Sequence, residues 1–229
     1  MFSKGLSKAA AEDDLTNERV KTKNSDQTNP FVKIELVLKR DKFLLNRQVV
    51  DPADEENFEY ENLGEVEVEL FENLVPNAVE KFFQMKKKGL LSKLEFCYMI
   101  KNNFIETRQP DGKEKNRTIS DSVDWSSYPF VNIDNESSAL KHQDIGYLYF
   151  YSPDSLENSY DMGITLNPIP WYDGTNQVFG HVCKGIDILK KLNGRLLDGK
   201  LDNFKTMLNS VMIKSCRYFK NHDHTVFTF

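Results

Sequence analysis

The sequence lacks the features that would place it in several broad classes of protein. No apolar run approaches the roughly 18 residues that a membrane-spanning helix requires, so no such span is predicted. There is no excess of positive charge, because the formal net charge is -5, and a nucleic-acid partner would need a positive surface to bind phosphates. A secretory apolar segment and an arginine-rich presequence are also missing. We therefore expect no membrane span and no nucleic-acid partner.

Cysteines and clustered metal ligands are scarce as well. The three cysteines, Cys97, Cys183 and Cys216, are an odd number, lie far apart and sit in apolar stretches. We therefore expect buried free thiols in a reducing, intracellular compartment. Because the N-terminal stretch is followed at once by acidic residues, unlike a cleaved presequence, we expect a cytoplasmic or mitochondrial location with an uncleaved N-terminus. His222 and His224 have the spacing of metal ligands but no further ligands beside them, so neither a metal nor any other cofactor is predicted.

The composition favours one β-rich domain with extensions. The 229 residues suffice for a large core, and 16 phenylalanines and 9 tyrosines suit one built on a sheet. We interpret the polar residues 1–28 as an N-terminal arm or linker, 29–219 as the domain and 220–229 as a tail. An insertion at about 39–63 is predicted to be an exposed loop or a hairpin extension. Its acidic stretch 51–61 indicates a solvated face or, secondly, a docking segment for a basic partner.

Local patterns predict two strands and two helices. A strand is predicted over 31–38, and 64–71 alternates apolar residues with glutamate, as a half-buried strand does. Pro76 opens a helix predicted to extend to Lys88, because its missing N–H costs nothing there and apolar residues follow at helical spacing. A second helix is predicted at about 185–193.

Four segments together carry a family resemblance. The stretch WYDGTNQVFGHVCKGIDIL at 171–189 fits the pattern W-x-D-G-x-x-x-V-F-G-x-V-x-x-G-x-x-I. The pattern G-x-V-x-x-E-L-F begins at Gly64, FCYMIKNNF begins at Phe96, and an L-K-H-x-x-x-G-x-L segment begins at Leu140. In this order the segments resemble the cyclophilins, which are peptidyl-prolyl isomerases. The resemblance implies a mostly β fold: an eight-stranded antiparallel β-barrel capped by the two predicted helices, with the arm and the acidic insertion outside it.

The resemblance also implies which residues should carry the chemistry. Rotation of an X–Pro bond faces a barrier of about 18–20 kcal/mol, and the family lowers it with an arginine cation and an apolar slot for the proline ring. Tyr98 stands at the arginine position, and Gly163 stands at the phenylalanine that forms the floor of the slot. Asn176 replaces a histidine of the groove. These positions look degenerate, so no residue is assigned as catalytic.

The remaining groove positions follow from the same resemblance. Trp171 is retained, and a packed tryptophan at the edge of the core is favoured over one that binds a ligand through its indole N–H. Arg108 is a candidate replacement for the lost cation, although it follows the strand by several residues. Tyr98, Tyr151 and Tyr172 either fill the groove or form an aromatic surface for a partner. The ligand-groove positions are Met99, Phe104, Tyr151, Ser152, Asp161, Trp171 and Tyr172.

Three functions are compatible with this pattern. Scaffold positions are kept while site positions are replaced, which favours a structural or adaptor subunit with protein partners in a multi-subunit assembly. One alternative is an active isomerase with an unusual site, which would turn over Xaa-Pro peptides. The other is a proline-peptide binding module without turnover. That module requires an open slot, and Gly163 and Tyr151 argue against one of the usual shape.

Overall fold

The computed structural model describes residues 29–41, 57–107, 136, 138–151, 160–195, 205–219 and 226–227. The predicted arm, the middle of the predicted insertion and most of the predicted tail lie outside this part of the chain. The helices are α2 (Pro76–Lys87) and α3 (Ile186–Arg195), with single 3-10 turns η3 (Leu91–Lys93) and η6 (Pro170–Tyr172). The strands are β1 (Phe31–Asp41), β2 (Phe58–Leu70), β3 (Glu95–Ile100), β4 (Phe104–Glu106), β5 (Tyr147–Phe150), β6 (Met162–Thr165), β7 (Gln177–Lys184), β8 (Lys205–Phe219) and β9 (Val226–Phe227).

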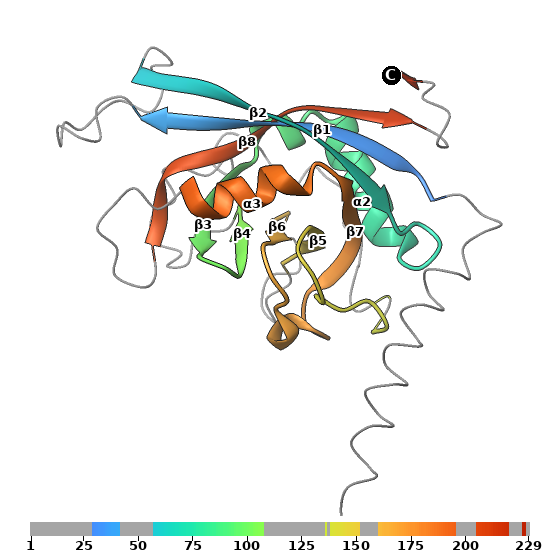
Figure 1. The fold of residues 1–229 in the computed structure, drawn as a ribbon. Helices are drawn as coiled ribbons and strands as arrows, with labels where there is room; N and C mark the ends of the chain where they lie inside the picture. Colours follow the sequence, from blue (N-terminus) through green and yellow to red (C-terminus); the bar gives the residue numbers. More distant parts are fainter. Residues whose placement is uncertain are drawn as a thin grey trace, which may run out of the picture.

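The strands form one sheet that closes on itself (Figure 1). Its order is β1-β2-β7-β5-β6-β4-β3-β8-β9, and β1 also pairs with β8, so eight strands complete a ring. Every pairing among the described strands is antiparallel. The predicted eight-stranded antiparallel β-barrel with two helices is confirmed, and β9 adds a short strand outside the ring.

The apolar alternation predicted from the sequence fills the inside of this barrel. Val66, Val68 and Leu70 on β2 are at most 1% exposed. Between them, the Glu67 carboxylate pairs with Lys184 Nζ on β7 at 3.1 Å. Burial of alternate apolar side chains is the main stabilisation of such a strand. The predicted strand over 64–71 is confirmed, although β2 begins six residues earlier and ends one residue earlier than predicted.

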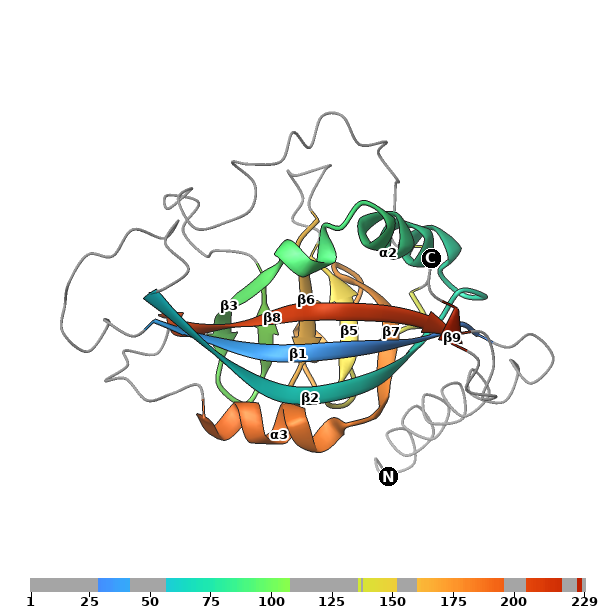
Figure 2. The same cartoon turned by 90° about the horizontal axis from the view of Figure 1, so that it is seen from above.

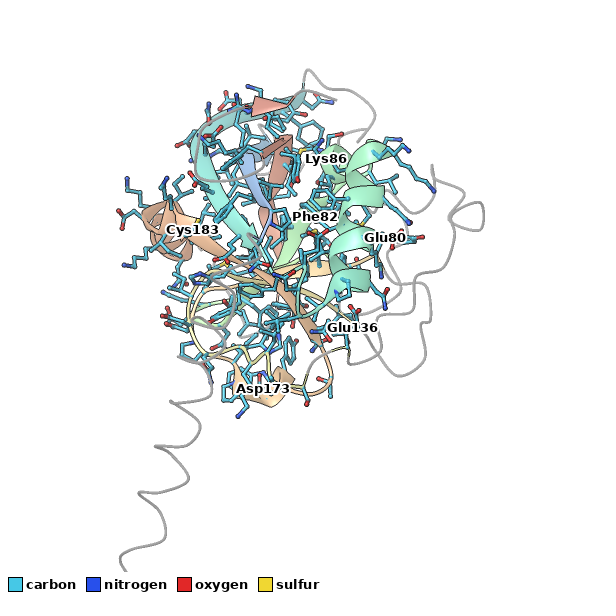
Figure 3. The ribbon with its side chains drawn as sticks, turned by 90° about the vertical axis from the view of Figure 1, so that its right-hand side faces the viewer. Glu80, Phe82, Lys86, Glu136, Asp173 and Cys183 are labelled. Carbon is cyan, nitrogen blue, oxygen red and sulfur yellow. The ribbon has the colours of Figure 1, made fainter. Side chains whose placement is uncertain are left out.

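The two helices lie on opposite sides of the barrel (Figure 2). α2 follows the prediction to within one residue, and α3 begins one residue later and ends two residues later than predicted. α2 buries Phe82, whose ring centroid lies 5.5 Å from that of Phe179. The Phe179 ring in turn stacks on Phe150 at 4.5 Å. Figure 3 shows Phe82 on the inner side of α2 and Glu80 on the outer side, so this helix closes the barrel with its apolar face.

The N-terminus of α2 is capped from a distant part of the chain. The backbone N–H groups of Asn77 and Ala78 donate to the two carboxylate oxygens of Glu136, at 2.9 and 2.8 Å. Figure 3 shows Glu136 beside this end of the helix. A carboxylate here satisfies otherwise unpaired N–H groups and faces the positive end of the helix dipole.

β1 and β2 form a hairpin that extends well beyond the part of β2 that pairs with β7 in the barrel. They stay paired out to Asp41 opposite Phe58, with one irregularity between Leu36 and Val37. Of the two interpretations of the predicted insertion, the described ends at 39–41 and 57–63 match a hairpin extension.

The prediction of three buried thiols is wrong for one cysteine. Cys97 is buried and Cys216 is partly buried, whereas Cys183 is exposed because it lies at the outward-facing end of β7. All three are free thiols. None of the described helices has the length and apolarity needed to cross a bilayer.

Candidate functional site

A row of four register partners crosses the barrel wall at the predicted site. Tyr98 on β3 pairs with Glu106 on β4, Glu106 pairs with Gly163 on β6, and Gly163 pairs with Tyr149 on β5. The predicted positions Tyr98 and Gly163 therefore belong to one row. Glu106 and Tyr149 complete it, and neither was predicted from the sequence. Finding them requires the register between β5, β6 and β4, which no local pattern reports.

Gly163 leaves a space that the ring of Tyr149 occupies. A Cβ added at Gly163 would lie 2.3 Å from Cζ, 2.4 Å from the hydroxyl oxygen and 2.8 Å from Cε1 of Tyr149. Tyr149 is fully buried, with 0% of its surface exposed. The space beside position 163 is thus filled by an aromatic ring from the neighbouring strand.

The Tyr149 phenol also ties β5 to β4 across the glycine. Its O–H donates to Glu106 Oε1 at 2.7 Å, and Glu106 is itself 0% exposed. Because Gly163 has no side chain, the phenol can extend over β6 and reach the carboxylate. A buried carboxylate needs such donors, since removing it from water is costly. The row is therefore a closed polar and aromatic contact rather than an open slot.

An aromatic cluster continues from Tyr149 to the rim. We define it as Tyr98, Phe104, Tyr149, Tyr172 and His142. Phe104 and Tyr172 stack with ring centroids 5.3 Å apart, and Tyr98 lies 5.9 Å from Phe104. Tyr149 meets Tyr172 edge to face at 5.7 Å and His142 at 4.9 Å. Of the two roles left open for Tyr98 and Tyr172, these contacts favour filling of the groove.

His142 is held in the wall of this cluster by a single carboxylate. Asp173 Oδ1 accepts from the backbone N–H of His142 at 2.8 Å and contacts its Nδ1 at 2.9 Å. Burial lowers the pKa of His142 below its usual value, and the bond to Asp173 opposes that shift only in part. With Nδ1–H donating to the carboxylate, the neutral ring keeps Nε2 as an acceptor, and Nε2 is buried without a partner.

A second buried network lies beneath Asp161. Thr107 Oγ1 donates to Asp161 Oδ1 at 2.9 Å and accepts from the backbone N–H of Met162 at 3.1 Å. Lys81 of α2 reaches the same region, with Nζ 4.6 Å from the centre of the Phe150 ring. Burial lowers the pKa of Lys81 to about 8, although the Asp161 charge raises it. The carboxylate of the predicted groove position Asp161 is therefore held by the Thr107 hydroxyl and interacts with the charge of Lys81.

Trp171 points away from the cluster, and the expectation of a packed tryptophan was wrong. Its side chain is 58% exposed. It lies in the single turn η6 between the exposed Pro170 and the half-buried Tyr172, whose ring turns inward to Phe104. Trp171 and Tyr172 are successive residues of a short turn, so their side chains point in different directions, and it is Tyr172 that packs into the cluster.

The other predicted positions lie around the cluster. Met99 and Asn176 are buried, at 5% and 6% exposed. Tyr151 is half-buried just after β5, where its backbone N–H donates to the carbonyl of Asp161 at 2.9 Å. Ser152 and Arg108 lie outside the described residues. Among the residues that the structure describes, no group of three or more potential ligands could hold a metal ion.

Comparisons with known proteins agree with this fold. A family model described as cyclophilin type peptidyl-prolyl cis-trans isomerase/CLD matches residues 57–218. Peptidyl-prolyl cis-trans isomerase cypE of Dictyostelium discoideum is 28% identical over 131 residues, which are 57% of this chain and 80% of that protein. Peptidyl-prolyl cis-trans isomerase-like 2 of Rhizopus delemar is 32% identical over 139 residues, 61% of this chain and 25% of that protein. The crystal structure of a cyclophilin type peptidyl-prolyl cis-trans isomerase from Cryptosporidium parvum matches with a TM-score of 0.54 and 19% identity, over 84% of this chain and 99% of that one.

Proposed function

Because the chain belongs to the family of cyclophilin-type peptidyl-prolyl cis-trans isomerases, we propose that it is a catalytically degenerate member that acts as a structural or adaptor subunit of a protein assembly. The observation that carries the proposal is the position of Tyr149. Its buried ring takes the space beside Gly163, where the family resemblance puts the floor of the proline slot. Protein interiors are packed too densely for a proline ring to share that space.

The position where the family resemblance puts the catalytic arginine also holds no cation. Tyr98 carries no charge at neutral pH, and it is 4% exposed and packed near Phe104. A single preorganised donor contributes on the order of 3–4 kcal/mol to catalysis, judged from the removal of oxyanion-hole donors. Loss of the cation alone therefore supports a rate decrease of roughly 10²–10³-fold.

The adaptor role is supported by the contrast between scaffold and site. The barrel closes completely and the apolar side chains of its strands are buried, as a stable fold requires. The surface still presents large side chains, since Trp171 is 58% exposed and Tyr60 is 51% exposed. Exposed aromatic residues of this kind are common anchors in protein interfaces. A closed barrel with exposed aromatic side chains and a filled slot suits binding better than turnover.

An active isomerase with an unusual site is the second candidate. It is favoured by the relatives, which are named isomerases, and by Trp171, which keeps its side chain at the surface. It would need Tyr98 or Arg108 to act as the donor to the proline nitrogen. It would also need the aromatic cluster to open for the proline ring.

The test is an isomerisation assay on an Xaa-Pro peptide with the purified full chain. We expect the wild type to be as slow as the uncatalysed reaction. The matched variant combines Tyr98→Arg, Tyr149→Ser and Gly163→Phe, which restores the cation and exchanges the filling ring for a slot floor. Tyr98→Arg alone serves as its control, because the slot stays filled. Acceleration by the wild type of about 10²-fold or more would overturn the proposal.

The adaptor half of the proposal has a separate readout. Chemical cross-linking of the chain in its native extract should join it reproducibly to the same protein neighbours in fixed stoichiometry. Recovery of the chain only as an isolated monomer, under conditions that preserve other assemblies, would contradict the adaptor role.

A further inference from the structure

One edge of the long hairpin has no neighbouring strand among the residues that the structure describes. β2 pairs with β1 along its whole length, but with β7 only over Glu67–Leu70. α3 covers the next part, since a Cβ added at Gly64 would lie 2.9 Å from Ile188 Cδ1. Figures 1 and 2 both show the far end of β2 projecting beyond α3. The outer edge of 58–62 is therefore open on the described surface.

The register identifies which backbone groups face outward there. The backbone N–H of Leu70 donates to the carbonyl of Pro30 at 2.9 Å, which sets the phase of the β1–β2 ladder. The irregularity in this ladder adds a residue to β2 and none to β1, so the alternation along β1 is unbroken. The backbone groups of every second residue of β1, counted from Pro30, therefore face β2, and these include Leu38 and Arg40. The backbone groups of their register partners Glu61 and Glu59 face β1 in return. Tyr60 lies between those partners, so its N–H and C=O point away from β1. An unpaired edge of this kind is a template for another strand.

The hairpin is held rigid enough to receive a strand. β1 is paired on its other side with β8 as far as Arg40 opposite Asn209, which gives a platform three strands wide. Arg40 Nη2 pairs with Glu61 Oε2 at 2.6 Å, and Lys39 Nζ lies 4.2 Å from the centre of the Phe58 ring. A preformed edge lowers the ordering cost of binding.

The side chains along the edge specify the chemistry of the occupant. Glu59 is exposed and Glu61 is partly exposed, and both lie on one face of β2 by alternation. Tyr60, 51% exposed, lies on the other face. Arg40 already pairs with Glu61, so these two glutamates and Arg40 together leave one net negative charge on that face. A strand beside this edge would place basic residues across from the glutamates and apolar residues across from Tyr60.

A second copy of the chain fits this edge poorly. Antiparallel pairing of two such edges about Tyr60 would put Glu59 of one copy opposite Glu61 of the other. Like charges directly opposite each other destabilise a strand pair. The charge pattern therefore selects against self-association and for a basic segment.

We propose that the outer edge of β2 over 58–62 is a docking site for one extended strand of a partner protein, in which lysine or arginine alternates with apolar residues. The inference rests on the adaptor function proposed above, because it states what kind of segment the adaptor takes. Backbone hydrogen bonds supply affinity in this binding mode, and alternate side chains supply specificity.

The test uses the full-length chain and a labelled peptide of seven residues in which lysine alternates with valine. A matched peptide carries glutamate at every lysine position. We expect fluorescence anisotropy to give at least tenfold tighter binding of the lysine peptide. Hydrogen exchange at the Tyr60 amide should slow when that peptide binds, because the outward N–H gains a partner. Equal binding of the two peptides would overturn the proposal.

Variants separate strand addition from loose charge attraction. Tyr60→Pro removes the outward N–H and leaves the β1 ladder intact, so we expect at least a tenfold loss of binding. Glu59→Lys provides a second variant that keeps the backbone, and it should reverse the preference between the two peptides. Glu80→Lys on α2 makes the same charge change far from the edge and should change nothing. Full binding by Tyr60→Pro, or protection centred on Trp171 instead of Tyr60, would contradict the site.

The outcome is distinguishable from that of the isomerase assay. A wild type that isomerises Xaa-Pro peptides and also binds the lysine peptide at Tyr60 overturns the proposed degeneracy and leaves the docking edge standing. A wild type that is catalytically silent and does not distinguish the two peptides overturns the docking edge alone.

Discussion

Gly163→Ala is expected to destabilise the barrel although it adds one methyl group to a strand. At an ordinary strand position, alanine is better than glycine by roughly 0.5–1 kcal/mol, because the unfolded chain loses less freedom. At Gly163 the new Cβ would lie 2.3–2.8 Å from three atoms of the Tyr149 ring. Real Cβ atoms do not approach other atoms so closely, so the ring or a strand must move.

The loss of stability depends on how far the Tyr149 ring can move away from the new methyl group. Tyr149 is 0% exposed and its hydroxyl is held by Glu106 at 2.7 Å. Overpacking of such a site costs about 1–3 kcal/mol, which exceeds the gain from removing a glycine. We therefore expect a net loss of ~1–3 kcal/mol in the free energy of unfolding.

A double-mutant cycle isolates the contact. In a Tyr149→Ser background the ring is gone, so Gly163→Ala should be neutral or slightly stabilising, with a coupling energy in the range of roughly 0.5–3 kcal/mol. The assay is urea unfolding of all four chains, followed by circular dichroism at constant m-value. Gly89→Ala is the control: a Cβ there would meet nothing within 4 Å, and although alanine is unfavourable at the φ of +68°, its cost should be the same with and without the Tyr149 ring. An equal cost of Gly163→Ala in both backgrounds would refute the filled slot.

The remaining predictions concern buried groups and one helix cap, all measured by urea unfolding. Lys81→Met should stabilise the chain at pH 7 by about 1–3 kcal/mol, because burial in the folded state lowers the pKa of Lys81 to about 8. This gain should shrink as pH rises from 8 toward 10.5, because the folded wild type then releases a proton that the unfolded chain still holds. His142→Asn should lose less stability than wild type as pH falls below about 6.5, the ordinary pKa of histidine, since burial lowers the pKa of His142 and the unfolded chain takes up its proton first. Glu136→Gln should cost about 0.5–2 kcal/mol, because the carboxylate caps α2; a cost below the error of measurement would contradict that role.

The fold was predictable because local patterns and chain order suffice for it. Val66, Val68 and Leu70 alternate with glutamates, and an apolar residue at every second position is typical of a strand with one buried face. Pro76 followed by an apolar stripe predicted α2 to within one residue. The order of the motifs then supplied the barrel through the family resemblance.

The candidate site was only half predictable. The missing side chain at Gly163 was predictable from the resemblance, but the ring that replaces it was not, since Tyr149 belongs to another strand and its position depends on register. Glu106 was missed for the same reason. The direction of Trp171 depends on which residue of η6 turns inward, and side-chain type does not decide that.

The most direct test of the account is whether the chain admits proline at Gly163 at all. An Ala-Pro peptide would be titrated into the isotope-labelled full chain while the backbone amide signals of Gly163 and Phe104 are followed by NMR. With the Tyr149 ring in the slot, neither signal should move in a saturable way at millimolar peptide. Saturable shifts at both amides would show that the slot opens, and would contradict the claim that it is filled.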